Sequence, residues 1–222
     1  MASTGDAGAA TSDAEETTAE PSSSSVASWA RALDRADHLL VLADGRGNEE
    51  SEWVQVWGSL LAADRPVTLR HWGEAQDRSF NPATPLSEDG GEGRPLTIWS
   101  ASRAASSIAS VTELLPRIDS ASADPDVLLV SLGAASAEED VPDALDGLLA
   151  ALPPGLAGVP VLVVVGPSGS GSEEGVDDAV ATWAQEHADD VALVDLRESG
   201  AGDADPQGWA QALQEALGGD DR

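Results

Sequence analysis

The sequence predicts an α/β fold, a three-layer α/β/α sandwich in which helices cover both faces of a mostly parallel, five-stranded sheet. Short runs of consecutive apolar residues recur along the chain, and stretches with helical spacing of apolar residues separate them. Apolar runs without polar alternation are typical of strands buried on both faces, as in a parallel sheet. Their alternation with helices predicts the α/β class, and 41% hydrophobic residues are enough for a sizeable core.

Apolar runs define the expected strands, and the first run is expected at the centre of the sheet. The runs are His38–Ala43, Pro66–Leu69, Leu96–Trp99, Asp126–Leu132 and Pro160–Val165, and a sixth, Val191–Leu196, follows near the end. The segment Gly73–Arg94 is rich in Gly, Pro, Asp and Ser. It is therefore expected to be a long excursion from the strand–helix alternation.

The expected helices begin with VASWARALDRA, where Val26, Trp29 and Leu33 recur at helical spacing. Comparable stretches follow at Trp53–Ala62, Ile108–Leu115, Pro142–Leu152, Val176–His187 and Gln207–Leu217. Pro142 and Pro206 suit first turns, where a missing N–H costs no hydrogen bond. Five of the seven tryptophans lie on these helices and are expected to pack against the sheet: Trp29, Trp53, Trp57, Trp183 and Trp209.

Residues 1–25 are expected to form a disordered, acidic, Ser- and Ala-rich tail, and residues 26–222 a single domain. The tail has no apolar period with which to offset the entropy of ordering. It lacks the basic and apolar regions of a secretory signal, so the chain as written is expected to be cytoplasmic. The same stretch is also typical of the linker of a secreted protein whose signal was replaced by Met1, and the sequence leaves that alternative open.

Composition excludes several function classes. Forty Asp and Glu against 11 basic residues, all of them arginine, give a net charge of −29. Such a chain repels phosphate backbones and anionic lipid, so neither nucleic acid nor a membrane is expected as a partner. The chain has no cysteine, which excludes disulfides, thiolate metal sites and cysteine nucleophiles. A small molecule or another protein remains as the expected partner.

Candidate binding residues follow the expected strands, because ligands of open parallel sheets bind beyond the carboxyl ends of the strands. They are Asp44, Arg46, Asn48, Ser102, Arg103 and Ser136. Arg103 is expected to contact an anionic ligand or to pair with Asp44. No metal or cofactor is expected: Glu49 occupies the place of the glycine that a calcium loop needs. GPSGSGSEEG also lacks the lysine of a phosphate-binding loop.

Four segments resemble, in order, the sequence blocks of the SGNH (GDSL) hydrolases, from about residue 38 to residue 217. LVLADGRGNEESEWV lies where that family has a strand, then Gly-Asp-Ser, then a helix. IWSASRAAS lies where its oxyanion glycine occurs, VLLVSLGAAS where it reads Gly-x-Asn-Asp, and DADPQGWAQALQEAL where it reads Asp-x-x-His-Pro. The resemblance implies a flavodoxin-like arrangement of the sheet and the chemistry of a serine ester hydrolase.

The catalytic positions that the resemblance implies are vacant. The nucleophile falls on Gly45, the oxyanion asparagine on Ala135, and the histidine near Asp205, while the oxyanion glycine falls within residues 102–105. The sequence therefore predicts a degenerate, catalytically inactive member that acts as a binding or accessory protein. The alternative is an active ester or acyl hydrolase of esterase, lipase or carbohydrate deacetylase type with a displaced nucleophile. Its candidates are Ser100, Ser102, Ser106, Ser136 and Ser168, with His71 as the base.

Overall fold

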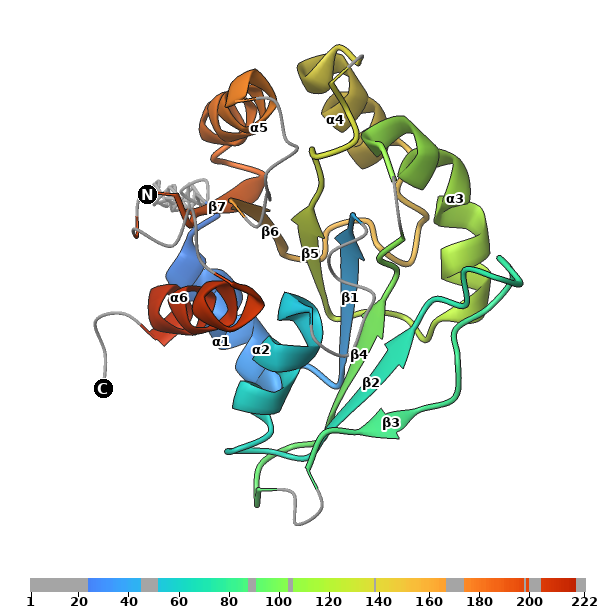
Figure 1. Cartoon of the computed structure of the whole chain (residues 1–222), viewed down its shortest axis with the longest axis vertical. Helices are drawn as coiled ribbons and strands as arrows, with labels where there is room; N and C mark the ends of the chain where they lie inside the picture. Colours follow the sequence, from blue (N-terminus) through green and yellow to red (C-terminus); the bar gives the residue numbers. More distant parts are fainter. Residues whose placement is uncertain are drawn as a thin grey trace, which may run out of the picture.

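Strand β1 lies at the centre of a sheet in which all strands but one run parallel (Figure 1). The computed structural model describes residues 24–44, 52–87, 91–103, 106–137, 139–166, 174–197, 199 and 205–218. The strand order is β3-β2-β4-β1-β5-β6-β7. The strands are β1 His38–Ala43, β2 Val67–His71, β3 Thr84–Pro85, β4 Leu96–Ser100, β5 Val127–Ser131, β6 Val161–Val165 and β7 Val191–Asp195. The predicted class and the central position of the first strand are confirmed.

The described sheet has seven strands, so the predicted number of five is too low. One additional strand, β7, comes from the sixth apolar run. The other, β3, lies inside the excursion Gly73–Arg94 and pairs antiparallel with β2. It is two residues long and exposed, and it contains a proline, which sheets tolerate at an edge. Such a strand buries no side chain and therefore has no apolar run in the sequence.

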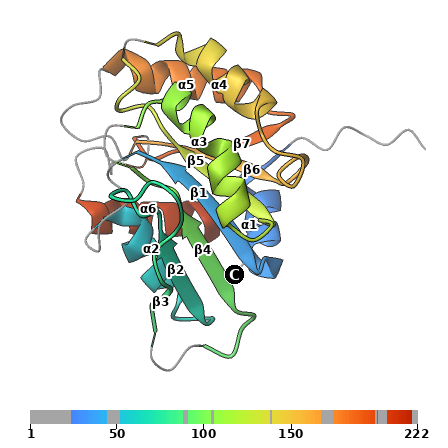
Figure 2. The same cartoon turned by 90° about the vertical axis from the view of Figure 1, so that its right-hand side faces the viewer.

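Helices cover both faces of the sheet, as the sequence predicts (Figure 2). On one face lie α1 (Val26–Arg35), α2 (Trp53–Leu61) and α6 (Pro206–Gly218); on the other lie α3 (Ile108–Ala121), α4 (Val141–Ala150) and α5 (Glu174–Glu186). Strand β1 explains why the apolar runs are continuous. Leu39 and Val41 face the first layer of helices, Leu40 and Leu42 face the second, and all four are fully buried.

Helix α3 is longer than the stretch Ile108–Leu115 that the sequence predicts, because it continues through Pro116 to Ala121. A proline inside a helix removes one backbone hydrogen bond. The apolar face nevertheless continues beyond it, since Leu115 and Ile118 are both fully buried while Pro116 is exposed. Burial of this face outweighs the local cost of the proline.

The first described residues already belong to the folded part of the chain. The Ser25 hydroxyl caps α1 by accepting a hydrogen bond from the Ser28 amide at 3.1 Å. The Ser24 amide donates to the Ala188 carbonyl at 3.0 Å. Residues 1–23, which make up most of the predicted tail, lie outside the described residues. Within the described chain, no helix combines the length and the hydrophobicity that crossing a bilayer requires.

Candidate functional site

The carboxyl ends of β4, β1 and β5 meet at one edge of the sheet, because the three strands are parallel neighbours. The chain leaves β1 toward β2 on one side, and β5 lies on the other side, so this is where the winding of the sheet reverses. Two hydrogen bonds tie the strand ends together. The Ala101 amide donates to the Val41 carbonyl at 2.8 Å, and the Asp44 amide donates to the Ser131 carbonyl at 3.2 Å.

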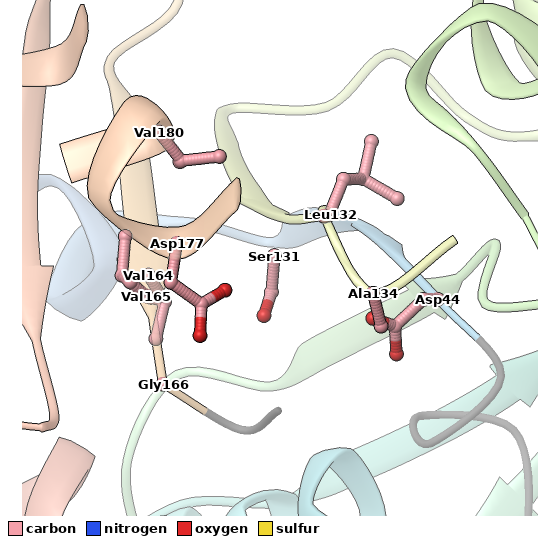
Figure 3. Close-up of a pocket in the computed structure, with 10 residues that line it drawn as sticks. Asp44, Ser131, Leu132, Ala134, Val164, Val165, Gly166, Asp177 and Val180 are labelled. Atoms are coloured by element: carbon pink, nitrogen blue, oxygen red, sulfur yellow. The ribbon is translucent and has the colours of Figure 1, made fainter. Parts of the chain in front are cut away.

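A small pocket of about 10 Å³, open to solvent, lies at this edge between the ends of β1, β5 and β6 and the first turn of α5 (Figure 3). Three polar side chains line it: Asp44, Ser131 and Asp177. All three are buried, with exposed fractions of 9%, 7% and 8%. The rest of its wall is apolar or glycine, comprising Leu132, Gly133, Ala134, Val164, Val165, Gly166 and Val180. The two carboxylates and the hydroxyl therefore lie in a pocket whose accessible surface is mostly polar.

Gly133, which follows the end of β5, lies beside the first turn of α5. A Cβ atom on Gly133 would lie 3.4 Å from Val176 Cγ1 and 3.7 Å from Asp177 Oδ1. Gly133 also has a φ of +155°, and Gly166, at the end of β6, has a φ of +119°. Residues other than glycine rarely adopt these backbone angles. The two glycines thus allow the backbone to turn closely around the pocket.

Asp44 is the predicted binding residue that lines this pocket, whereas Ser102 and Ser136 are used inside the protein. The Ser102 side chain is fully buried, and its Oγ lies 2.9 Å from Ser100 Oγ. Ser136 is also fully buried, and its Oγ accepts a hydrogen bond from the Ile108 amide at 3.0 Å. Ser136 therefore satisfies an amide at the start of α3. Neither residue lines the pocket.

Arg103 pairs with Asp77 instead of the predicted Asp44. The distance from Arg103 Nη2 to Asp77 Oδ1 is 3.6 Å. Asp77 also accepts hydrogen bonds from Trp72 Nε1 at 3.0 Å and from Arg117 Nη1 at 2.7 Å. The hydrogen bond from Trp72, followed by the hydrogen bond from Arg117 and the positive charge of Arg103, holds the pKa of Asp77 below its usual value. The backbone of Asp77 is left-handed, with a φ of 45°, so this carboxylate fixes the loop after β2.

Other predicted site positions carry no catalytic group. Ala135 is exposed and has only a methyl side chain. Asp205 caps α6, because its Oδ1 accepts a hydrogen bond from the Gly208 amide at 2.9 Å. Gly45, Arg46 and Asn48 lie outside the described residues. Among the described residues, no three His, Asp or Glu side chains gather as they would around a metal ion.

The histidines are distributed over both edges of the sheet. His38 begins β1, and His187 follows α5 ahead of β7, so both lie at the amino edge. The His187 ring stacks on Trp183 with 4.5 Å between ring centroids. His71 ends β2 and lies at the carboxyl edge, with its Nε2 3.2 Å from Gln55 Oε1. Of the three histidines, His71 is therefore the one at the edge where the alternative function, ester hydrolysis, would need a proton acceptor.

Sequence reasoning missed two of the three polar residues of the pocket. Ser131 is the polar end of the apolar strand VLLVS, a signal that was available in the sequence. Asp177 lies in the first turn of α5, where acids commonly complement the helix dipole. Its approach to the end of β5 depends on how α5 packs, which the sequence pattern does not specify.

The comparisons with known proteins show the fold. No family profile and no curated protein matches the chain. A serine-to-alanine variant of an acetyl esterase, solved with acetate ion, has 15% identity and a TM-score of 0.52, and the match covers 82% of this chain and 94% of that one. Two further solved structures cover 82% of this chain at 12% identity. One is a psychrotrophic esterase from Pseudoalteromonas sp. inhibited by monoethylphosphonate (97% of that chain, TM-score 0.48). The other is the catalytic domain of a Streptococcus pneumoniae peptidoglycan O-acetyltransferase with a methylsulfonyl adduct (91% of that chain, TM-score 0.45). The likeness to the acetyl esterase shows that this chain has the α/β fold of an esterase.

Proposed function

We propose that this chain is a binding protein built on an esterase fold, which holds a small molecule at the carboxyl edge of its sheet and does not cleave esters. The observation that carries the proposal is the burial of four of the five serines that the sequence offers as replacements for a missing nucleophile. Ser100, Ser102 and Ser136 are fully buried, and Ser106 is 3% exposed. A hydroxyl that substrate cannot reach cannot attack an ester carbonyl. The fifth candidate, Ser168, lies outside the described residues.

The chemistry of ester cleavage supports the same conclusion. At neutral pH the reaction needs an activated nucleophile and a proton acceptor in one cleft. At the positions that correspond to the hydrolase blocks, the chain has Gly45, Ala135 and Asp205, none of which supplies a nucleophilic hydroxyl, an oxyanion amide or an imidazole. Loss of a nucleophile and its base lowers turnover by about a millionfold in a serine hydrolase.

An active ester hydrolase is the second candidate function, and the position of His71 favours it. This imidazole lies at the carboxyl edge, where a general base would be needed. A working enzyme of this kind would require a serine from one of the neighbouring strand ends within hydrogen-bond reach of His71. The two candidates differ in whether turnover depends on that imidazole.

Hydrolysis of p-nitrophenyl acetate by the full chain tests the proposal. We expect the wild-type protein, Gly45→Ser and His71→Ala all to show the rate of a protein-free blank. The Gly45→Ser variant restores a hydroxyl but not a base, so it should not gain activity. Saturable turnover by the wild-type protein that disappears in His71→Ala would overturn the proposal and establish the hydrolase.

A further inference from the structure

We propose that Arg103 binds the carboxylate of a small organic monoanion at the carboxyl edge of the sheet. This inference rests on the proposed function, because it names the class of ligand that this edge would hold. It goes beyond the fold likeness, which concerns ester chemistry and assigns no role to an arginine. Three features of Arg103 point to such a ligand: its place after β4, its incomplete hydrogen bonding and the charge around it.

Arg103 lies at the edge where ligands of open parallel sheets bind. It comes three residues after the end of β4, which is the parallel neighbour of β1. Its side chain extends toward the loop after β2, where its Nη2 lies 3.6 Å from Asp77 Oδ1. The side chain is 28% exposed, so a dissolved ligand can reach the guanidinium. This position lies on the opposite side of β1 from β5 and β6, and it is separate from the pocket at their ends.

The guanidinium of Arg103 is incompletely hydrogen-bonded. Its Nε is buried and has no hydrogen-bond partner among the residues that the structure describes. Its contact of 3.6 Å with Asp77 is longer than an N–H···O hydrogen bond. A buried donor without an acceptor destabilises the folded protein. A carboxylate that accepts from Nε and Nη2 together would remove this cost, and because Nε is covered, we expect the guanidinium to turn away from Asp77 as the ligand binds.

Asp77 can release Arg103 because other donors satisfy its carboxylate. Trp72 Nε1 donates to Oδ1 at 3.0 Å, and Arg117 Nη1 donates to Oδ2 at 2.7 Å. Arg117 Nη1 also donates to the Asp77 carbonyl at 3.0 Å. These three hydrogen bonds hold the loop after β2 without any contribution from Arg103. The loop therefore keeps its anchors when Arg103 turns toward a ligand.

The charge around Arg103 selects a monoanion as the ligand. Arg103 and Arg117 share the single carboxylate of Asp77, so these three side chains together carry one uncompensated positive charge. One carboxylate neutralises that charge, and its two oxygens match the planar fork of a guanidinium. A phosphate dianion would need a second cation, and Arg117 is already engaged by Asp77. The net charge of −29 also repels a dianion more strongly than a monoanion.

Titration of the full chain with sodium propionate, followed by the NMR shifts of the Arg103 Nε–H group and of the Ser102 and Ser106 amides, tests the proposal. We expect saturable shifts, with a dissociation constant on the order of 10 mM, because one charged contact in water is weak. Arg103→Gln should weaken binding at least about fivefold, and Arg103→Lys about twofold, because lysine keeps the charge without the fork. Arg78→Gln is the matched control, because it removes one exposed arginine next to Asp77 and should leave binding unchanged.

Three probes separate carboxylate binding from other effects of the added salt. Propionamide has the shape of propionate without its charge, and sodium chloride at equal ionic strength supplies an anion without a carboxylate. Neither should produce a saturable shift of Arg103 Nε–H, and inorganic phosphate should bind more weakly than propionate. Equal shifts with propionamide or chloride, tighter binding of phosphate, or equal losses in Arg103→Gln and Arg78→Gln would refute the proposal. The absence of any saturable shift would refute it as well. The ester assay is independent of these outcomes, so turnover there would overturn the non-catalytic function alone.

Discussion

Replacing Arg65 by methionine should destabilise the protein by about 3 kcal/mol, because the guanidinium donates hydrogen bonds to four backbone carbonyls, two of them in buried contacts. Arg65 is 8% exposed. Its Nε donates to the Arg94 carbonyl at 2.6 Å, and its Nη1 to the Leu33 carbonyl at 2.9 Å. Its Nη2 donates to the Ala36 carbonyl at 2.5 Å and more weakly to the Pro95 carbonyl at 3.4 Å. Arg65 thereby joins the end of α1 to the segment that enters β4.

The magnitude follows from counting the carbonyls that lose their donor. The Leu33 carbonyl also accepts from the Ala36 amide at 3.1 Å and therefore keeps a partner. The other three lose the hydrogen bond from Arg65, at about 1 kcal/mol each. Burial lowers the pKa of Arg65, which shows that the folded protein already bears a desolvation cost for this charge. Methionine recovers that cost and fills a similar volume, so the net loss stays near the sum of the three bonds.

Chemical denaturation followed by tryptophan fluorescence measures this loss. A decrease of about 3 kcal/mol corresponds to a melting temperature about 6–12 °C lower for a domain of this size. Arg65→Lys should lose about half as much, because an ammonium group cannot reproduce the planar fork. Arg31→Met is the control, since Arg31 lies exposed on α1 and donates to the Ala27 carbonyl of the same helix. A change below about 0.5 kcal/mol in Arg65→Met would refute the reasoning.

Three further predictions concern stability. Because the pKa of Asp77 is lowered in the folded protein, its ionised form stabilises the fold above about pH 4, and this contribution is lost as the pH falls further. Asp77→Asn should therefore flatten the acid side of the plot of melting temperature against pH, and an unchanged plot would contradict the role of this carboxylate. Trp29→Phe should lower the free energy of unfolding, measured in urea, by about 1–3 kcal/mol, because Trp29 Nε1 donates to the Leu128 and Pro160 carbonyls at 3.1 and 3.2 Å. An unchanged free energy would show that water replaces the indole N–H. The melting temperature should rise as the sodium chloride concentration increases to about 1 M, since salt screens the repulsion within a chain of net charge −29. A melting temperature that falls with salt would mean that attractive ion pairs dominate.

The strands could be predicted because burial on both faces leaves a direct signal in the sequence. β1 and β5 are apolar at consecutive positions, and the structure packs helices against both of their faces. Short edge strands have no such signal, which is why β3 was missed. The limit predicted for α3 was too early, because the helix continues through Pro116 to Ala121. The apolar face that extends to Ile118 was the stronger determinant.

The candidate site could be predicted only as a place in the fold. The carboxyl edge follows from the order of strands and helices, and Asp44 was identified because it directly follows a buried strand. Ser136 also comes after a buried strand, yet its hydroxyl accepts a hydrogen bond from the amide of Ile108, 28 residues away in the chain. Asp177 reaches the pocket because α5 packs close to Gly133. Contacts of this kind depend on tertiary packing and leave no local pattern.

Reaction of the full chain with a fluorophosphonate, followed by intact-protein mass and peptide mapping, tests the central claim most directly. An activated serine is phosphonylated stoichiometrically whatever ester the enzyme prefers, so the measurement does not depend on guessing a substrate. The account predicts an unchanged mass for the wild-type protein under conditions that fully label a serine esterase. A single stoichiometric adduct on any serine at the carboxyl edge, absent in His71→Ala, would contradict it.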